Sequence, residues 1–450
     1  MSQSISAESN GNKLVSGITG ISVSGYKSLY EECSIEIRPL TILAGANSSG
    51  KSSIMQPLLL MKQTLEASYD PGALLIYGSH IQFTLAAQFL SQLAVKKKSD
   101  SFTITVEVDN TSLFTSTFKK HSSKGVELIE TTYDFWNNSN HKFKVKLSTK
   151  MSHEDFIMSL PAFIKRFDEH FLQIEREGDK PKYKAKRERC FLDLELVLGQ
   201  ESMGGGMNFS SSFQSHIRNL IHIPGLRGNP ERTYKTTAIG REFSGTFDNY
   251  VASVLNYWNE TKDERLQEIG GALETFGLTS KVDAKQINDV QIELSVSRSP
   301  SSGEATEMVS IADVGLGVSQ VLPVLVALLV AEPGQLVYLE QPEIHLHPRA
   351  QAALAEILAD AAKRGVRVVL ETHSELLLLA VQSLVAEGKL SPDLVKLHWF
   401  TRREDGVTEV NSAELDDAGA FGDWPEDFSN VSLKLESRYL NAAEARLWQR

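Results

Sequence analysis

Residues 45–52 read Gly45-Ala46-Asn47-Ser48-Ser49-Gly50-Lys51-Ser52, a complete G-x-x-x-x-G-K-[ST] pattern. The mostly apolar residues 40–43 lead into it as a buried strand, and residues 54–61 follow it as one helical run. A strand, a glycine-rich turn and a helix N-terminus together form a structure that cradles phosphates. The sequence therefore predicts a nucleotide-binding loop in a P-loop α/β fold.

Each part of this loop has a chemical task. Backbone N–H groups of residues 47–52 would point at the β- and γ-phosphate oxygens. Lys51 would neutralise the phosphates, and the Ser52 hydroxyl would ligate Mg²⁺. We therefore expect a nucleotide with Mg²⁺, held by Gly45, Asn47, Ser48, Gly50, Lys51, Ser52 and Ser53.

The composition, 41% hydrophobic and 23% charged, is that of an ordinary globular protein, and 450 residues favour about two or three domains. Only Cys33 and Cys190 are cysteines, which fits a reducing cytoplasm, so a cytoplasmic location is predicted. The polar residues 1–13 lack the apolar core of a signal peptide and are predicted to be disordered. The net charge of −11 argues against a surface that generally coats nucleic acid.

In the first half of the chain, alternating patterns predict short strands in 18–43 and again in 81–148. Residues 151–200 switch to a helical period. Glycines 204–206 and serines 210–212 predict a flexible break. The helical period rests on one apolar face made of Phe156, Leu160, Phe163, Ile164, Phe167 and Phe171.

In the second half, helices and apolar strands alternate, which predicts a parallel sheet covered on both faces. Because the phosphate loop lies far upstream of this core, the middle of the chain is predicted to be a large inserted lobe of mixed α+β structure. No long heptad run is present, so no long coiled coil is expected. The expected helices are 249–276, 321–330 and 349–363, and the expected strands 290–296, 336–339 and 366–370.

Two further segments carry candidate site residues. Glu340 ends an apolar strand, where a carboxylate can hold Mg²⁺ through water, and His373 follows the next strand, where it can contact a γ-phosphate and the attacking water. Residues 315–320 open a helix with two glycines and a serine, which is a second anion-binding N-terminus. Since one nucleotide needs one phosphate loop, this second element is predicted to serve a neighbouring chain's nucleotide.

This order of motifs resembles the ABC-type ATPase heads of the SMC, RecF and OLD group, which dimerise around ATP. The resemblance rests on a "gyKS" turn at 25–29, the loop at 45–52, a signature-like segment at 315–320, YLEQPEIHLHP from Tyr338, and ETHSE at 371–375. It implies ATP as the nucleotide and Lys27 beside it. It also implies a partner-completing contact from Gly315, Gly317, Ser319 and Gln320.

The resemblance also implies a domain plan. An ATPase core of 18–80 and 220–390 would follow a tail of 1–17, with the lobe at 81–219 and a C-terminal cap at 391–450. Residues 222–227 and 421–428 resemble an uncharacterised subfamily of bacterial AAA-annotated ATPases. Its members often occur in phage-defence or toxin-like operons beside an effector, which implies an effector protein encoded nearby.

The sequence departs from the group at two places. Gln341 stands where the water-activating Glu is usual, so Glu343 or His373 would have to arrange the water, and slow or partner-triggered hydrolysis is expected. The Toprim nuclease domain of OLD proteins is absent from this chain, and the acidic residues at 416–427 are interpreted as solvated loop charge.

The favoured interpretation is an ATPase, hydrolysing ATP to ADP and phosphate, that closes its heads around ATP and switches an effector. An ATP-held scaffold with little turnover stays open, as does a DNA-structure sensor that would use Lys182, Lys184, Lys186 and Arg187. A zinc site built on His345 and His347 is disfavoured, because no third spaced ligand is evident.

Overall fold

The computed structural model describes residues 15–94, 97–121, 125–136, 142–159, 182–198, 201–298, 307–422 and 437–441. The predicted tail before residue 15, the helical face at 160–171 and the acidic segment at 423–427 lie wholly or largely outside these residues.

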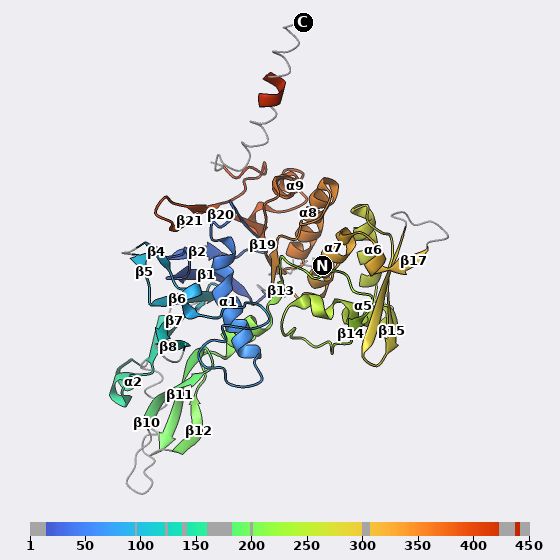
Figure 1. Cartoon of the computed structure of the whole chain (residues 1–450). Helices are drawn as coiled ribbons and strands as arrows, with labels where there is room; N and C mark the ends of the chain where they lie inside the picture. Colours follow the sequence, from blue (N-terminus) through green and yellow to red (C-terminus); the bar gives the residue numbers. More distant parts are fainter. Residues whose placement is uncertain are drawn as a thin grey trace, which may run out of the picture.

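A parallel sheet forms the centre of the molecule (Figure 1). Each of its first five strands runs parallel to its neighbour, and only the last is antiparallel. In spatial order the strands are β13 (Ile221–Ile223), β18 (Leu336–Glu340), β19 (Arg367–Glu371), β3 (Leu40–Gly45), β20 (Val395–Arg402) and β21 (Thr408–Ala413).

Helices cover both faces of this sheet because side chains alternate along each strand. Val337 and Leu339 share a core with the helices α7 (Leu316–Val330), α8 (Pro348–Lys363) and α9 (Glu375–Ala386). Leu336 and Tyr338 point to the opposite face, where they share a core with α1 (Lys51–Glu66). The buried-on-both-sides strands predicted from the apolar runs are confirmed.

An antiparallel sheet packs on the other side of α1, so that α1 lies in a core shared by both sheets. The pairing of β1 with β6 joins the range predicted as core to the range predicted as lobe. In order the strands are β2 (Cys33–Glu36), β1 (Ile18–Ser24), β6 (Ser101–Val108), β7 (Ser112–His121), β8 (Gly125–Trp136) and β9 (Lys142–Ser148). The short strands β4 (Gln92–Ala94) and β5 (Lys97–Lys98) pair beside it.

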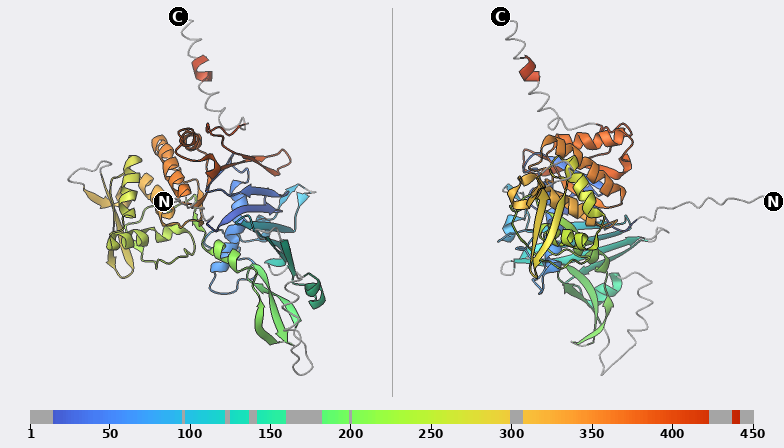
Figure 2. Two further views of the ribbon diagram at one scale, coloured as in Figure 1. Left: turned by 180° about the vertical axis from the view of Figure 1, so that it is seen from behind. Right: turned by 90° about the vertical axis from the view of Figure 1, so that its right-hand side faces the viewer.

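Two smaller units project from these layers, as the views in Figure 2 show. One holds β10 (Lys182–Glu188), β11 (Phe191–Leu198) and β12 (Glu201–Met207), with α2 (His153–Ser159) and α4 (Ser211–Arg218) nearby. The other packs α5 (Val251–Thr261) and α6 (Arg265–Thr275) between α7 and a sheet of β14 (Tyr234–Lys235), β15 (Val282–Asn288), β16 (Gln291–Ser297) and β17 (Met308–Ser310). Short 3₁₀ turns are η1 (Ala86–Gln88), η2 (Phe247–Tyr250), η3 (Ile311–Asp313) and η4 (Pro392–Leu394).

The predicted fold class is confirmed: this is an α/β P-loop fold with mixed sheets. The longest helices of the described residues, α1 and α8, have 16 residues, so no long coiled coil occurs among them. None of the described helices is long and apolar enough to cross a membrane.

Two local predictions are wrong. Within 151–200, residues 182–198 form the β10–β11 hairpin and not a helix. Lys182, Lys184 and Lys186 alternate with the buried Tyr183, and this period of two is the strand signal. The glycines at 204–206 belong to strand β12, and Gly205 and Gly206 pair with β11 where a loop was expected.

His398, on β20, gives the fold a pH dependence. Its Nε2 lies 2.8 Å from the Glu36 carbonyl and its Nδ1 2.8 Å from Ser412 Oγ, and burial lowers its pKa to about 4. The unfolded chain binds a proton here below about pH 6.5 while the folded chain does not, so this contribution to stability is lost as pH falls from about 6.5 to 4.

We therefore expect the destabilisation caused by His398→Gln to shrink by up to about 3 kcal/mol between pH 7 and pH 4. Denaturant unfolding of both chains across this range measures the difference. If the difference in unfolding free energy between the two chains stays constant with pH, His398 is not the source of this pH dependence.

Candidate nucleotide-binding site

The phosphate loop joins β3 to α1 in a conformation that needs glycine. Gly45 has φ 139° and Gly50 φ 110°, both in the left-handed half of the map. A Cβ on Gly45 would collide with the Phe400 carbonyl oxygen, and one on Gly50 would lie 2.6 Å from Thr408 Oγ1. The pattern glycines therefore let the loop pack against the β20–β21 hairpin and keep its N–H groups turned inward.

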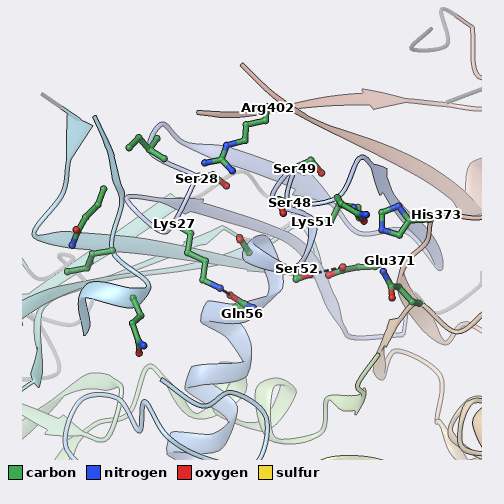
Figure 3. Close-up of a pocket in the computed structure, with 18 of the residues that line it drawn as sticks. Lys27, Ser28, Ser48, Ser49, Lys51, Ser52, Gln56, Glu371, His373 and Arg402 are labelled. Carbon is green, nitrogen blue, oxygen red and sulfur yellow. Dashed lines mark hydrogen bonds between the residues drawn. The ribbon is translucent and has the colours of Figure 1, made fainter. Parts of the chain in front are cut away.

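A cavity of about 540 Å³ opens above this loop, a volume suited to a nucleotide (Figure 3). The structure brings several predicted residues to its wall from four separate parts of the chain. They are Lys27, Asn47, Ser48, Gly50, Lys51, Ser52, Ser53, Gln341 and His373.

Lys51 and Ser52 make hydrogen bonds that a phosphate and a metal ion would replace. The Lys51 ammonium donates to the carbonyls of Gly45 (2.9 Å) and Ala46 (2.8 Å), and burial lowers its pKa. Ser52 Oγ donates to Glu371 Oε2 over 2.8 Å. Both side chains therefore lie at the loop with polar atoms facing the cavity, where the sequence placed them.

Lys27 reaches the cavity from the turn after β1. Its φ is 46°, its ammonium donates to Gln56 Oε1 over 2.6 Å, and it lies 4.9 Å from the centre of the Phe83 ring. Burial lowers the pKa of Lys27. Arg402 faces the cavity from β20 on the other side of the loop, as Figure 3 shows.

The groups predicted to arrange water are placed at different depths. Gln341 and His373 line the cavity, and burial, then the nearby Lys51, lowers the pKa of His373. Glu343 lies behind them: its Oε1 accepts from Thr372 Oγ1 (2.7 Å) and from the His373 N–H (2.9 Å). Its Oε2 is buried without a hydrogen-bond partner in the described structure. Glu343 thus positions the histidine and does not itself reach the cavity wall.

Glu340, predicted to hold Mg²⁺, does not line this cavity. It stands at the end of a chain of hydrogen-bonding side chains. Glu340 Oε1 lies 3.2 Å from His222 Nε2, and His222 Nδ1 lies 3.0 Å from His80 Nδ1. His80 Nε2 in turn lies 3.2 Å from Glu66. Lys62 completes the chain at 2.7 Å from Glu66. If both carboxylates are ionised, each of the three contacts made by the two imidazoles needs an N–H proton. Two neutral imidazoles carry only two such protons, so one more is required. Burial lowers the pKa of His80 to about 4.

The signature-like segment lies away from the cavity of its own chain. Gly315 and Leu316 are exposed at the start of α7, while Ser319 is buried and donates to the Leu316 carbonyl over 3.0 Å. Gln320 donates from Nε2 to the Gly228 carbonyl over 3.2 Å. Gly317, in the first turn of α7, lies close to Leu278. The structure therefore does not bring these predicted residues to the phosphate loop within one chain.

The sequence matches the AAA ATPase domain family over residues 17–378. This chain belongs to that family. No curated protein matches it.

The search of solved structures found SMC head domains. An Smc head bound to the C-winged helix domain of ScpA has 12% identity and a TM-score of 0.45, covering 89% of this chain and 99% of that one. An Smc head from Pyrococcus furiosus, bound to the C-terminal domain of ScpA, has 11% identity and a TM-score of 0.42, covering 90% and 98%. The SMC head from Thermotoga maritima has 9% identity and a TM-score of 0.34, covering 88% and 98%.

The donor set at the loop of this AAA ATPase domain suits Mg²⁺. The Ser52 hydroxyl and the Glu371 carboxylate are hard oxygen donors at the cavity wall. No group of three or more His, Cys, Asp or Glu side chains in the described ranges is arranged to hold a metal ion.

Sequence reasoning missed several residues of the site. Glu371 was part of the ETHSE motif but had no role, although it ends an apolar strand as Glu340 does. That shared strand-end position was the available signal. His222 and Arg402 carried no such signal, because their place at the site depends on sheet order.

Lys51→Ala should weaken binding of a fluorescent ATP analogue by about 10- to 100-fold, because a charge-assisted contact to phosphate is lost. Equilibrium titration of the full chain measures this. Lys119→Ala is the matched control, since it removes an exposed lysine that pairs with Asp100 on the antiparallel sheet. Equal affinity of Lys51→Ala and wild type would remove the phosphate role of this lysine.

Proposed function

We propose that this chain is an ATPase that uses ATP binding to close two copies of itself and slow hydrolysis to reopen them. The observation that supports this best is the convergence of residues 47–53 with Lys27, Gln341 and His373 on one cavity of about 540 Å³. A loop serving only as a turn needs no such convergence.

The loop would bind the phosphates before any chemistry occurs. Its N–H groups and the α1 N-terminus would hold the phosphate oxygens, and the Lys51 ammonium would leave the Gly45 and Ala46 carbonyls to neutralise them. Ser52 would turn its hydroxyl oxygen to Mg²⁺, which supplies charge neutralisation on the β- and γ-phosphates.

Water would be oriented by an amide and an imidazole. Gln341 has φ 44° and is fixed through its backbone, donating to the Glu371 carbonyl (3.0 Å) and accepting from Arg227 (2.9 Å). His373 is held by Glu343 through its N–H. Since an amide cannot accept a proton from water, turnover should be slow, and a long-lived ATP-bound state is the functional output.

Two copies would meet through the exposed start of α7. Gly315 is exposed and a Cβ there would meet nothing within 4 Å, so this end of the helix is open to a second molecule. Helix N-termini favour phosphate, and residues 315–320 would therefore complete the partner's nucleotide site. Homodimerisation through the ATP-bound heads follows from this arrangement.

The unit of β10–β12 projects away from the nucleotide site and is suited to carry the response to closure (Figure 2). We propose that this unit, within the predicted 81–219 lobe, contacts an effector protein encoded nearby. The subfamily resemblance at residues 222–227 and 421–428 favours a role in bacterial anti-phage defence.

A scaffold that holds ATP with little turnover is the second candidate, favoured by Gln341 in the cavity. Nucleic-acid binding receives less support. Lys186 pairs with Glu195 at 3.0 Å and Arg187 with Asp70 at 2.6 Å. Within the part of the chain that the structure describes, this leaves Lys182 and Lys184 as the exposed lysines of β10 without an ion pair. A salt-dependent DNA shift lost in Lys182→Ala/Lys184→Ala would reverse this order.

Gln341→Glu should raise steady-state ATP hydrolysis on the order of 10²- to 10⁴-fold, because a carboxylate can accept the proton from water. Phosphate release by wild type, Gln341→Glu and Gln341→Glu/Lys51→Ala measures this, and the double variant should be inactive. Unchanged or lower turnover in Gln341→Glu would place the proton acceptor elsewhere.

Gly315→Arg should keep ATP-analogue binding but abolish the ATP-dependent rise in particle mass, because the new side chain would occupy the surface offered to the partner. Light scattering with and without ATP measures the mass. Gly271→Arg, another exposed glycine with open space around it, is the matched control on α6. Dimers of Gly315→Arg that form as in wild type contradict pairing through α7.

A further inference from the structure

Two carboxylates end neighbouring strands beside the phosphate loop. Glu340 of β18 and Glu371 of β19 are direct partners in the parallel register. Only Glu371 lines the nucleotide cavity. Either side chain is therefore a candidate to hold the metal ion, and their hydrogen-bond contacts differ.

Both oxygens of Glu340 already have donors that belong to the fold. Its Oε1 lies 3.2 Å from His222 Nε2, and its Oε2 accepts from the Gly225 N–H over 3.1 Å. The His222 imidazole is fixed in turn by stacking on the Tyr338 ring, with centroids 5.3 Å apart and planes 11° apart. Glu340 is thus turned toward β13, away from Ser52.

Glu371 has a different balance of contacts. Its Oε2 accepts from Ser52 Oγ over 2.8 Å and its Oε1 accepts from the Tyr338 hydroxyl. Both donors are neutral, and the nearby Lys51 donates to loop carbonyls instead. Glu371 is only 3% exposed. Burying a carboxylate among neutral donors alone is costly.

A divalent cation would supply the missing counter-charge. Ser52 is the loop residue expected to ligate Mg²⁺, and Glu371 is hydrogen-bonded to that same hydroxyl. An ion bound to a lone pair of the Ser52 hydroxyl oxygen would therefore lie next to the Glu371 carboxylate. Mg²⁺ at nucleotide sites is held by one or two protein oxygens besides phosphate and water, which this pair provides.

We propose that Glu371 at the end of β19, and not Glu340 at the end of β18, is the carboxylate that holds the nucleotide-bound metal ion together with Ser52. Glu340 then acts as a positioning residue that fixes β18 to β13 through His222 and Gly225. This assignment rests on the proposed ATP-binding function and specifies the metal side of the same site.

The test measures metal binding and not turnover. The full chain, with a non-hydrolysable ATP analogue, is titrated with Mn²⁺ and the free ion is followed by electron paramagnetic resonance. Glu371→Gln should lower Mn²⁺ affinity by about 10- to 100-fold, and Glu340→Gln should lower it clearly less. Affinity for the analogue without metal should stay close to wild type in Glu371→Gln.

Controls separate the metal role from a folding role. Glu356→Gln changes an exposed carboxylate on α8 and should leave Mn²⁺ affinity unchanged. Tyr338→Phe removes the hydroxyl donor to Glu371 but keeps the carboxylate, so Mn²⁺ binding should persist. Ser52→Ala and Glu371→Gln should be non-additive, because both residues serve the same ion.

The outcomes are distinguishable. Wild-type Mn²⁺ affinity in Glu371→Gln, or a larger loss in Glu340→Gln, overturns this assignment and leaves ATP binding intact. A wild-type chain that binds no ATP analogue overturns the proposed function and this assignment with it. If Glu371→Gln is unstable, Glu371→Asp retains the charge and should show intermediate Mn²⁺ affinity; full wild-type affinity in the shortened side chain would contradict close contact with the ion.

Discussion

The parallel pairing of β3, β19 and β18 is the constraint on which the site depends. In this register Leu43 lies beside Glu371, and Glu371 beside Glu340. Strands from distant parts of the chain therefore end at one edge, where the phosphate loop leaves β3. Parallel pairing of this kind needs long crossover connections, and the helices that make them cover the sheet and exclude water from it. The cavity is the gap left at the ends of the covered strands.

Burial makes the charges at this edge strongly coupled. Lys51, Glu371 and Glu343 lie in a poorly hydrated region, where each charge needs a specific partner. The fold supplies neutral donors to Glu371, a hydroxyl and a backbone N–H to Glu343, and backbone acceptors to Lys51. These partners are the weaker alternatives to a phosphate and a cation. In the proposed function, ATP with its metal ion would satisfy groups that the protein alone satisfies only in part.

The Arg227 guanidinium links the start of α7 to the end of β18 through hydrogen bonds. Arg227, only 9% exposed, donates to the Gln320 carbonyl of α7 and to the Glu340 and Gln341 carbonyls after β18. The helix that would face a partner's nucleotide is therefore held to the strand end that faces the chain's own nucleotide. The His222–Gly225 contacts with Glu340 come from the same short segment. This segment gives a physical basis for linking the two sites of a dimer.

The sequence by itself determined the phosphate loop, the α/β alternation and the strand ends, because local spacing sets a glycine turn, a helical period or a buried strand. Gly45, Lys51, Ser52 and His373 were found in this way, and Gln341 through the resemblance to the SMC, RecF and OLD group. All of these residues but Gly45 line the cavity. The β10–β12 unit was misread where a period of two was taken for a helix and a glycine run for a break. Only the tertiary structure decided which of two carboxylates lines the cavity. Glu340 and Glu371 have the same local pattern, and the difference arises because β13 pairs with β18 and offers His222 and Gly225 to Glu340, while α1 places Ser52 beside Glu371. Such contacts depend on sheet order and not on any spacing along the chain.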